Sequence, residues 1–104
     1  MRQHVFKSGD AEFAVVDGRP TIRGECDLSN APAIESWLTS FGDAPIDIDL
    51  SGVTFFGASA LRALIAVAQR NPNLRVVDPS PVVRRVLDIT GTSYYLIEGT
   101  NLAK

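Results

Sequence analysis

Residues 46–64, IDIDLSGVTFFGASALRAL, constrain the fold more than any other part of the chain. Their first half alternates isoleucine or leucine with aspartate, which is the period of a strand with one buried face. Their second half repeats apolar residues at the spacing of a helix. A strand that leads through a tight apolar loop into a helix is the unit from which α/β folds are built.

Further strands and helices are expected around this unit. Short apolar or alternating runs between turn residues predict strands at residues 4–7, 11–16, 21–24 and 74–77. Helical spacing predicts helices after the capping residues Asn30 and Ser80. Residues 94–97 fit either a last strand or an apolar plug. The order predicts an α/β fold: a mixed sheet of four to five strands with three main helices packed mostly on one face.

The composition indicates one globular domain that lacks a surface for nucleic acid. The chain has 104 residues, a net charge of −2 and scattered basic side chains, whereas nucleic acids and anionic lipids require clustered ones. No apolar run reaches the ~20 residues of a membrane span, and the N-terminal residues lack the apolar core of a signal peptide. With a single cysteine there is no internal disulfide, so a cytoplasmic location is expected.

No group of residues indicates catalysis or a metal site. Asp47 and Asp49 share one strand face, but acid–base work would require a cleft that raises a carboxyl pKa. The one histidine, His4, has no clustered ligands around it. Cys26 has an acidic residue on each side, which disfavours a thiolate. We therefore expect neither an enzyme, nor a cofactor, nor a metal.

Ser59 is the residue with the clearest functional potential. It lies near the start of the expected helix, where backbone N–H groups point outward and the peptide dipoles favour negative charge. A phosphate on its hydroxyl would change the charge by roughly −1.5 to −2 at neutral pH. The sequence therefore suggests a switch, and the alternative is a serine that only caps the helix.

Three segments, in register, resemble the STAS domain family, the fold of bacterial anti-sigma factor antagonists. GECDLSNAPAIESWL is similar to that family's first strand-to-helix segment. IDIDLSGVTFFGASALRAL resembles its central D-L-S-G-V-x-F-x-D-S-S-G-L motif, and LRVVDPSPVVRRVLDITG its last strand and helix. The resemblance implies a single STAS domain over residues 1–104 with a STAS-like mixed sheet.

What the resemblance implies is regulation of transcription by partner switching. The unphosphorylated protein binds an anti-sigma factor, which is also a serine kinase, and so frees a sigma factor. Phosphorylation of the serine that matches Ser59 releases the anti-sigma factor, and a phosphatase resets the cycle. The implied partner surface consists of Asp27, Ser29, Phe56, Gly57, Ala58, Ser59 and Arg62. For Asp27 and Ser29, ordinary loop and capping chemistry is an equal alternative.

The central motif differs from the family pattern, because Gly57-Ala58-Ser59-Ala60 stands where Asp-Ser-Ser-Gly is expected. The missing aspartate removes a charge and a hydrogen-bond acceptor beside the hydroxyl. An antagonist that is never phosphorylated therefore stays open. So do an accessory STAS subunit of a membrane transport or lipid-trafficking complex, and a small-ligand sensor with a pocket between the first helix and Ser59. Of the adjacent Phe55 and Phe56, one is expected in the core; the other is either an exposed anchor beside Ser59 or, as an equal alternative, buried as well.

Overall fold

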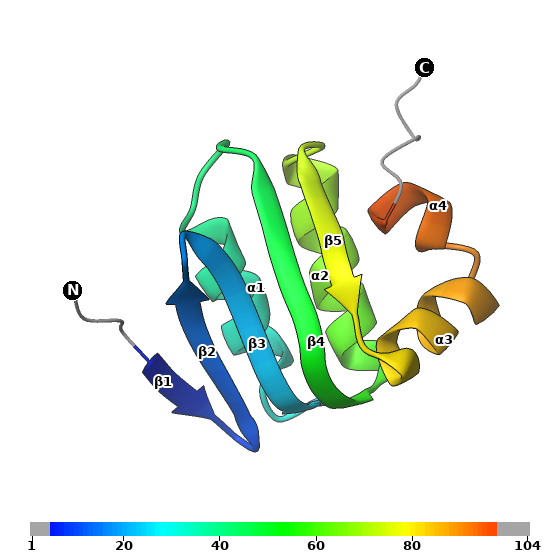
Figure 1. Cartoon of the computed structure of the whole chain (residues 1–104), viewed down its shortest axis with the longest axis horizontal. Coiled ribbons are helices and arrows are strands. Elements are labelled where there is room, and N and C mark those ends of the chain that lie inside the picture. The colour runs from blue at the N-terminus through cyan, green and yellow to red at the C-terminus, as the bar shows by residue number, and fades with distance from the viewer. Residues whose placement is uncertain (1–4, 98–104) are drawn as a thin grey trace.

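Within residues 5–97, five strands form one mixed sheet, in the spatial order in which they occur along the chain. The computed structural model describes residues 5–97. Its elements are β1 (Val5–Ser8), β2 (Ala11–Val16), β3 (Arg19–Cys26), α1 (Ala31–Thr39), β4 (Ile46–Phe56), α2 (Ala58–Arg70), β5 (Leu74–Pro79), α3 (Pro81–Ile89) and α4 (Ser93–Leu96) (Figure 1). The expected α/β fold is confirmed. His4, the expected first residue of β1, lies outside the described residues.

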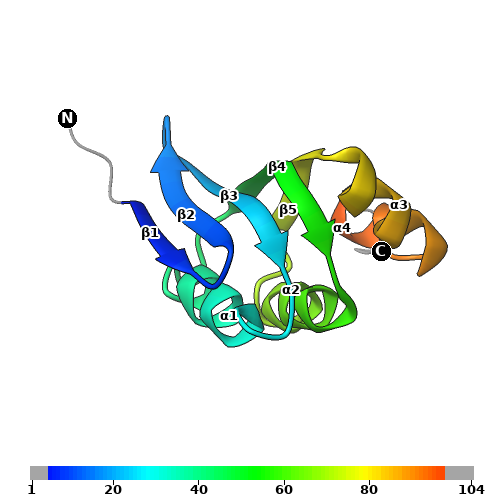
Figure 2. The ribbon, with the colours of Figure 1, turned by 90° about the horizontal axis from the view of Figure 1, so that it is seen from below.

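The sheet is antiparallel in its first half and parallel in its second. β1, β2 and β3 pair antiparallel, whereas β4 pairs parallel with both β3 and β5. Parallel neighbours need a crossover connection, and α1 and α2 provide the two crossovers. Both helices cover the same face of the sheet, while α3 and α4 lie at its β5 side, where α3 packs mainly against β4 (Figure 2). The β3–α1 and β4–α2 connections consequently lie at the same end of the sheet (Figure 1).

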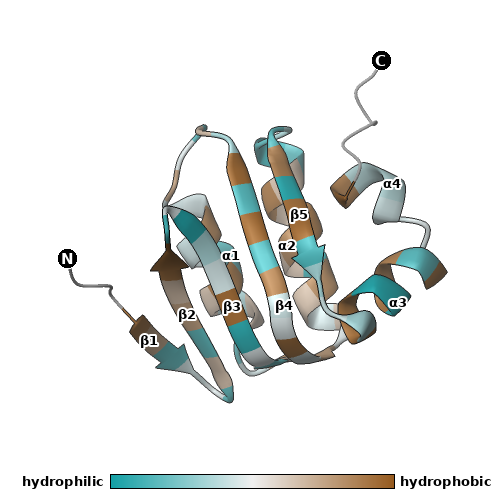
Figure 3. Ribbon diagram, viewed as in Figure 1, coloured by the Kyte–Doolittle hydropathy of each residue, from teal (hydrophilic) through white to brown (hydrophobic). Residues whose placement is uncertain are grey.

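β4 is longer than the alternating sequence predicts. Its early residues alternate between buried and more accessible, and the brown and teal bands of Figure 3 show the matching alternation of hydrophobic and hydrophilic residues. Pairing with β3 continues as far as Cys26 opposite Phe56, so Gly57 alone separates β4 from α2. The expected tight apolar loop is therefore absent from this connection. The continued ladder satisfies the backbone of these residues, which a loop at this buried position would not.

The core lies between the sheet and the helices, and α3 and α4 add Val83, Leu87 and Leu96 to the part covered by α1 and α2. Among its fully buried side chains are Phe13, Ile48 and Val76 from the sheet and Leu38 from α1. Helix α1 is also fixed to the β1–β2 hairpin by an aromatic cluster, in which the ring centroids of Phe13 and Trp37 are 5.2 Å apart. Edge-to-face aromatic pairs of this kind add to the burial energy, so the position of α1 beside the sheet is well determined.

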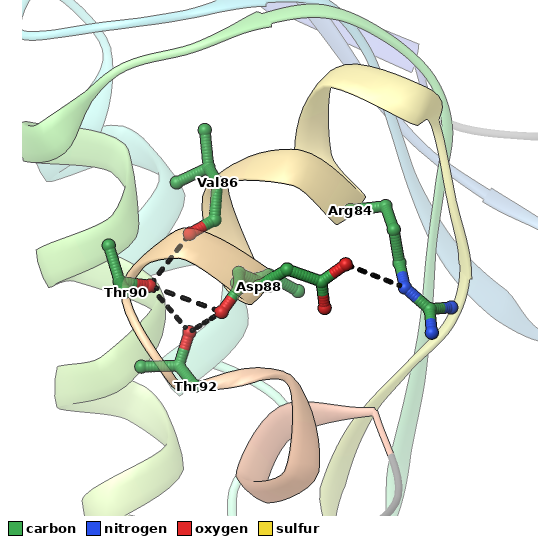
Figure 4. Close-up of polar contacts among 6 residues, drawn as sticks. Arg84, Val86, Asp88, Thr90 and Thr92 are labelled. Atoms are coloured by element: carbon green, nitrogen blue, oxygen red, sulfur yellow. Dashed lines mark hydrogen bonds and ion pairs between the residues drawn. The ribbon is translucent and has the colours of Figure 1, made fainter.

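Helix α3 begins with the side-chain cap that its sequence predicts and ends with a second side-chain bond that was not predicted. The Ser80 hydroxyl accepts a hydrogen bond from the Val83 N–H at 3.3 Å, as expected of an N-cap. At the other end, the Thr90 hydroxyl donates to the Val86 carbonyl at 2.7 Å (Figure 4). The following segment is the short helix α4, whose Leu96 is fully buried. Of the two alternatives for this segment, the apolar plug is correct and the strand is not.

Candidate functional site

The candidate site lies where the β3–α1 loop meets the start of α2. The Gly57 N–H donates to the Cys26 carbonyl at 2.9 Å, which joins the two connections directly. In sheets of this kind the carboxyl ends of parallel strands are the usual place for a functional site. The resemblance predicted that Asp27 and Ser29 lie on the same face as Ser59, and this direct backbone link is consistent with that.

Ser59 is the second residue of α2, and Gly57 is the N-cap. Ser59 is half-buried, and no hydrogen bond joins its hydroxyl to another residue of the described chain. The first turn of α2 has no side-chain cap, and its first intrahelical bond runs from the Leu61 N–H to the Gly57 carbonyl at 3.1 Å. The capping alternative is thus wrong for Ser59, whose hydroxyl remains available at a helix end that favours negative charge.

The structure corrects the assignment of Phe56 to the partner surface. Phe56 is only 6% exposed and belongs to the core, whereas Phe55 is 50% exposed. The Phe55 ring extends over Gly57, because a Cβ atom at Gly57 would lie 3.2 Å from the Phe55 Cε2 atom. Gly57 is therefore next to an aromatic side chain that a partner can contact, and Ala58, which follows it, is exposed. The anchor expected at this junction is Phe55.

The alternation of buried and accessible residues along β4 indicates which of Phe55 and Phe56 is buried, although the strand is not regular. Ile46, Ile48 and Leu50 are buried at even positions, and the next buried residue is Val53. Two register shifts between β4 and β3 explain why the buried side changes from even-numbered to odd-numbered residues at Val53 and returns to even-numbered residues at Phe56. Because the two shifts cancel, simple counting from Ile46 gives the correct side for Phe56. It gives the wrong side for Val53.

Asp27 and Ser29 form a local turn. The Asp27 carboxylate accepts from the Ser29 N–H at 3.0 Å and from the Ser29 hydroxyl at 2.6 Å. This is the loop chemistry that was the alternative to partner contact. The turn nevertheless has an exposed outer surface, since Leu28 between them is 76% exposed. An apolar side chain so far from the core is the feature of this loop that the sequence analysis missed.

The buried side chain of Asn30 holds the β3–α1 loop in place. It occupies the expected N-cap position of α1, but its side chain makes no capping bond. Its amide instead donates to the carbonyls of Ser8 and Glu25 at 3.0 and 2.9 Å, and its oxygen accepts from the Asp27 N–H at 2.9 Å. The side chain is fully buried. It therefore joins the β1–β2 turn, the end of β3 and the start of α1 into one rigid support.

A groove runs between α1 and α2 from Ser59. It has a volume of about 460 Å³ and is lined by Leu28, Ala31, Pro32, Glu35, Ser59, Arg62, Ala63 and Ala66. The four α2 residues follow helical spacing and so form one stripe. The groove is open to solvent, unlike the enclosed apolar pockets that bind small ligands. It occupies the place expected for a ligand pocket, and its open shape favours a macromolecular partner.

Charge within the groove is uneven. Glu35 forms an ion pair with Arg70 at 3.4 Å. Arg62 is exposed, and within residues 5–97 no carboxylate lies close enough to pair with it. Sequence spacing brings Arg62 next to Ser59, as predicted. The places of Leu28 and Glu35 in the same groove depend on how α1 packs on α2, which the sequence analysis did not address.

The remaining chemistry of the region is inert. Burial and, to a smaller extent, the negative charge of Asp27 together raise the pKa of the Cys26 thiol to about 12. The thiol is therefore protonated at neutral pH, in agreement with the expectation that it is unreactive. Over the described residues, no three His, Cys, Asp or Glu side chains cluster as metal ligands. Nor does any helix there have the length and apolarity needed to cross a membrane.

Comparison with known proteins agrees with this architecture. The STAS domain family matches residues 15–101. The chain belongs to the STAS domain family. Among solved structures, the crystal structure of an anti-sigma factor antagonist from Mycobacterium paratuberculosis matches this STAS domain with a TM-score of 0.64. The two chains are 28% identical, and the match covers 88% of this chain and 79% of the other.

Proposed function

We propose that this STAS domain is an anti-sigma factor antagonist. It binds an anti-sigma factor of the serine-kinase type and thereby releases a sigma factor for transcription. Family membership and the similarity to an anti-sigma factor antagonist support this role. ATP and the kinase chemistry belong to the partner, and this chain contributes a binding surface and a hydroxyl group.

The observation that carries the proposal is the set of exposed groups around Ser59. Phe55 and Leu28, two large apolar side chains, are 50% and 76% exposed at the end of the sheet where α2 begins. Arg62 adds an exposed cation one turn along the helix. Aromatic and arginine side chains dominate the binding energy of protein interfaces. A surface that combines them at the carboxyl ends of two parallel strands is suited to recognising another protein.

Phosphorylation of Ser59 is the proposed switch. The γ-phosphoryl group of the partner's ATP is transferred to the Ser59 hydroxyl oxygen, ADP leaves and the hydroxyl proton is lost. The resulting dianion would lie beside the exposed apolar side chains that the partner covers, where a charge opposes docking by its desolvation cost. The uncapped first turn of α2 supports this role, because its outward N–H groups favour a negative charge.

Mass spectrometry tests the switch. We expect the intact mass of the wild type to rise by a single phosphate after incubation with the cognate anti-sigma factor and ATP, and that of Ser59→Ala to stay unchanged. Ser51→Ala and Thr54→Ala are matched controls, because both side chains are exposed hydroxyls on β4; each should still gain one phosphate. Phosphate on the Ser59→Ala protein, or on none of the four proteins, would contradict Ser59 as the acceptor.

A further inference from the structure

The groove between α1 and α2 presents a cation that no carboxylate of residues 5–97 pairs with. Its lining contains one cation, Arg62, and one anion, Glu35. Glu35 is already paired with Arg70, which lies beyond the groove lining. Arg62 is thus the unsatisfied charge at the end of the groove nearest to Ser59, and a carboxylate is the group that it would bind best.

The groove also offers apolar surface. Leu28 extends from its α1 side and is 76% exposed. Small side chains, Ala63 and Ala66, line the α2 side, and small residues allow close approach by a partner. From Ser59 to Ala66 the α2 wall is about 10 Å long, at 1.5 Å per residue. This length corresponds to about two turns of a docked helix.

We propose that this groove binds an acidic amphipathic helix of the anti-sigma factor. An apolar side chain of that helix packs between Leu28 and the alanines of α2, and a carboxylate of the helix pairs with Arg62. Recognition of an amphipathic helix in a groove between two helices is a common mode of binding. The inference rests on the proposed function and adds the chemistry of the partner.

The same arrangement explains how Ser59 would control the groove. Ser59 and Arg62 are three residues apart on α2, so their side chains are neighbours on the helix surface. A phosphate on Ser59 would bind Arg62 within the chain, because arginine pairs strongly with phosphate. It would also repel the carboxylate of the incoming helix. One modification thus removes the attractive charge and introduces a repulsive one at the same end of the groove.

Binding measurements with matched variants test the groove. The probe is each purified anti-sigma factor of the serine-kinase type from the same organism, titrated into wild type and variants without ATP. Arg62→Glu reverses the free charge, and its control Arg85→Glu makes the same change in net charge on an exposed position of α3. Leu28→Ala removes the exposed anchor, and its control is Ile89→Ala, because Ile89 is 75% exposed on α3.

Arg62→Glu is expected to raise the Kd about 10- to 100-fold, in the range of lost charge pairs at interfaces. Leu28→Ala should raise it about tenfold, as anchor residues do. Both controls should bind like the wild type, and all four variants should unfold at the temperature of the wild type. Equal binding by wild type, Arg62→Glu and Leu28→Ala would contradict the proposal that the groove binds the partner helix, while the proposed function would stand. If no anti-sigma factor binds even the wild type, the proposed function itself fails, and the groove proposal with it.

Discussion

Gly24→Ala is expected to destabilise the fold by about 3 kcal/mol or more, because it combines backbone strain with overpacking. Gly24 has a φ of +98°, which side-chain-bearing residues rarely adopt. A Cβ atom there would lie 2.3 Å from the Asp10 carbonyl oxygen and 3.2 Å from the Ala11 Cα atom. Gly24 pairs with Ala11 on β2 and with Val53 on β4, so the backbone is held on both sides and cannot move away.

Gly18→Ala separates the effect of backbone strain from the effect of overpacking. Gly18 also has a positive φ, +77°, but in the described chain no atom outside Gly18 and its two sequence neighbours lies within 4 Å of the position of its Cβ. Its substitution should therefore cost only the backbone strain, about 1–2 kcal/mol. Urea unfolding of both variants measures the difference. Equal losses of unfolding free energy in the two proteins would show that the contact with Asp10 does not constrain the hairpin.

The second large effect is expected at Asn30. Asn30→Ala should reduce the free energy of unfolding by about 3 kcal/mol, because three hydrogen bonds are lost at a buried position. The carbonyls of Ser8 and Glu25 and the Asp27 N–H would each lose a partner. The loss should be visible as a fall of about 12 °C or more in Tm for a domain of this size. The β1–β2 turn and the start of α1 would no longer be tied together.

Two further variants test whether the lost hydrogen bonds of Asn30 cause the loss of stability. Asn30→Asp keeps the volume and the acceptor for the Asp27 N–H but replaces the donating amide with a carboxylate oxygen. It should therefore lose at least as much stability as the alanine variant. Asn73→Ala is the control, because Asn73 is exposed and no hydrogen bond of its side chain is found in the described part of the chain. A Tm for Asn30→Ala close to that of Asn73→Ala would contradict the support role of Asn30.

Elements with strong local signals could be predicted from the sequence, and elements defined by tertiary pairing could not. The Ser80 cap and the helix after it depend on residues within one turn, and they are as predicted. The extension of β4 to Phe56 depends on pairing with β3. The role of Asn30 depends on Ser8, which is 22 residues away. Its residue type suggested a cap, and only the fold shows that its amide is used elsewhere.

The candidate site also combines residues that could be predicted from the local sequence with residues that could not. Ser59 and Arg62 could be placed together from helix periodicity, since both belong to α2. The exposure of Leu28 could not be anticipated, because an apolar residue in a short loop is equally compatible with burial. Phe56 was expected on the partner surface in place of Phe55 because the alternation that starts at Ile46 was not followed to the end of β4, where it gives Phe56 as buried. Surfaces assembled from two elements therefore required the three-dimensional structure, whereas a switch residue at a helix start did not.

The most direct measurement of the proposed role is release of a sigma factor. A preformed complex of the anti-sigma factor with its sigma factor is titrated with this STAS domain, and free sigma factor is followed by size-exclusion chromatography. We expect the unphosphorylated domain to displace the sigma factor and to elute with the anti-sigma factor, and the phosphorylated domain to leave the complex intact. If the sigma factor stays bound in every such complex at an excess of unphosphorylated domain, the chain is not an anti-sigma factor antagonist.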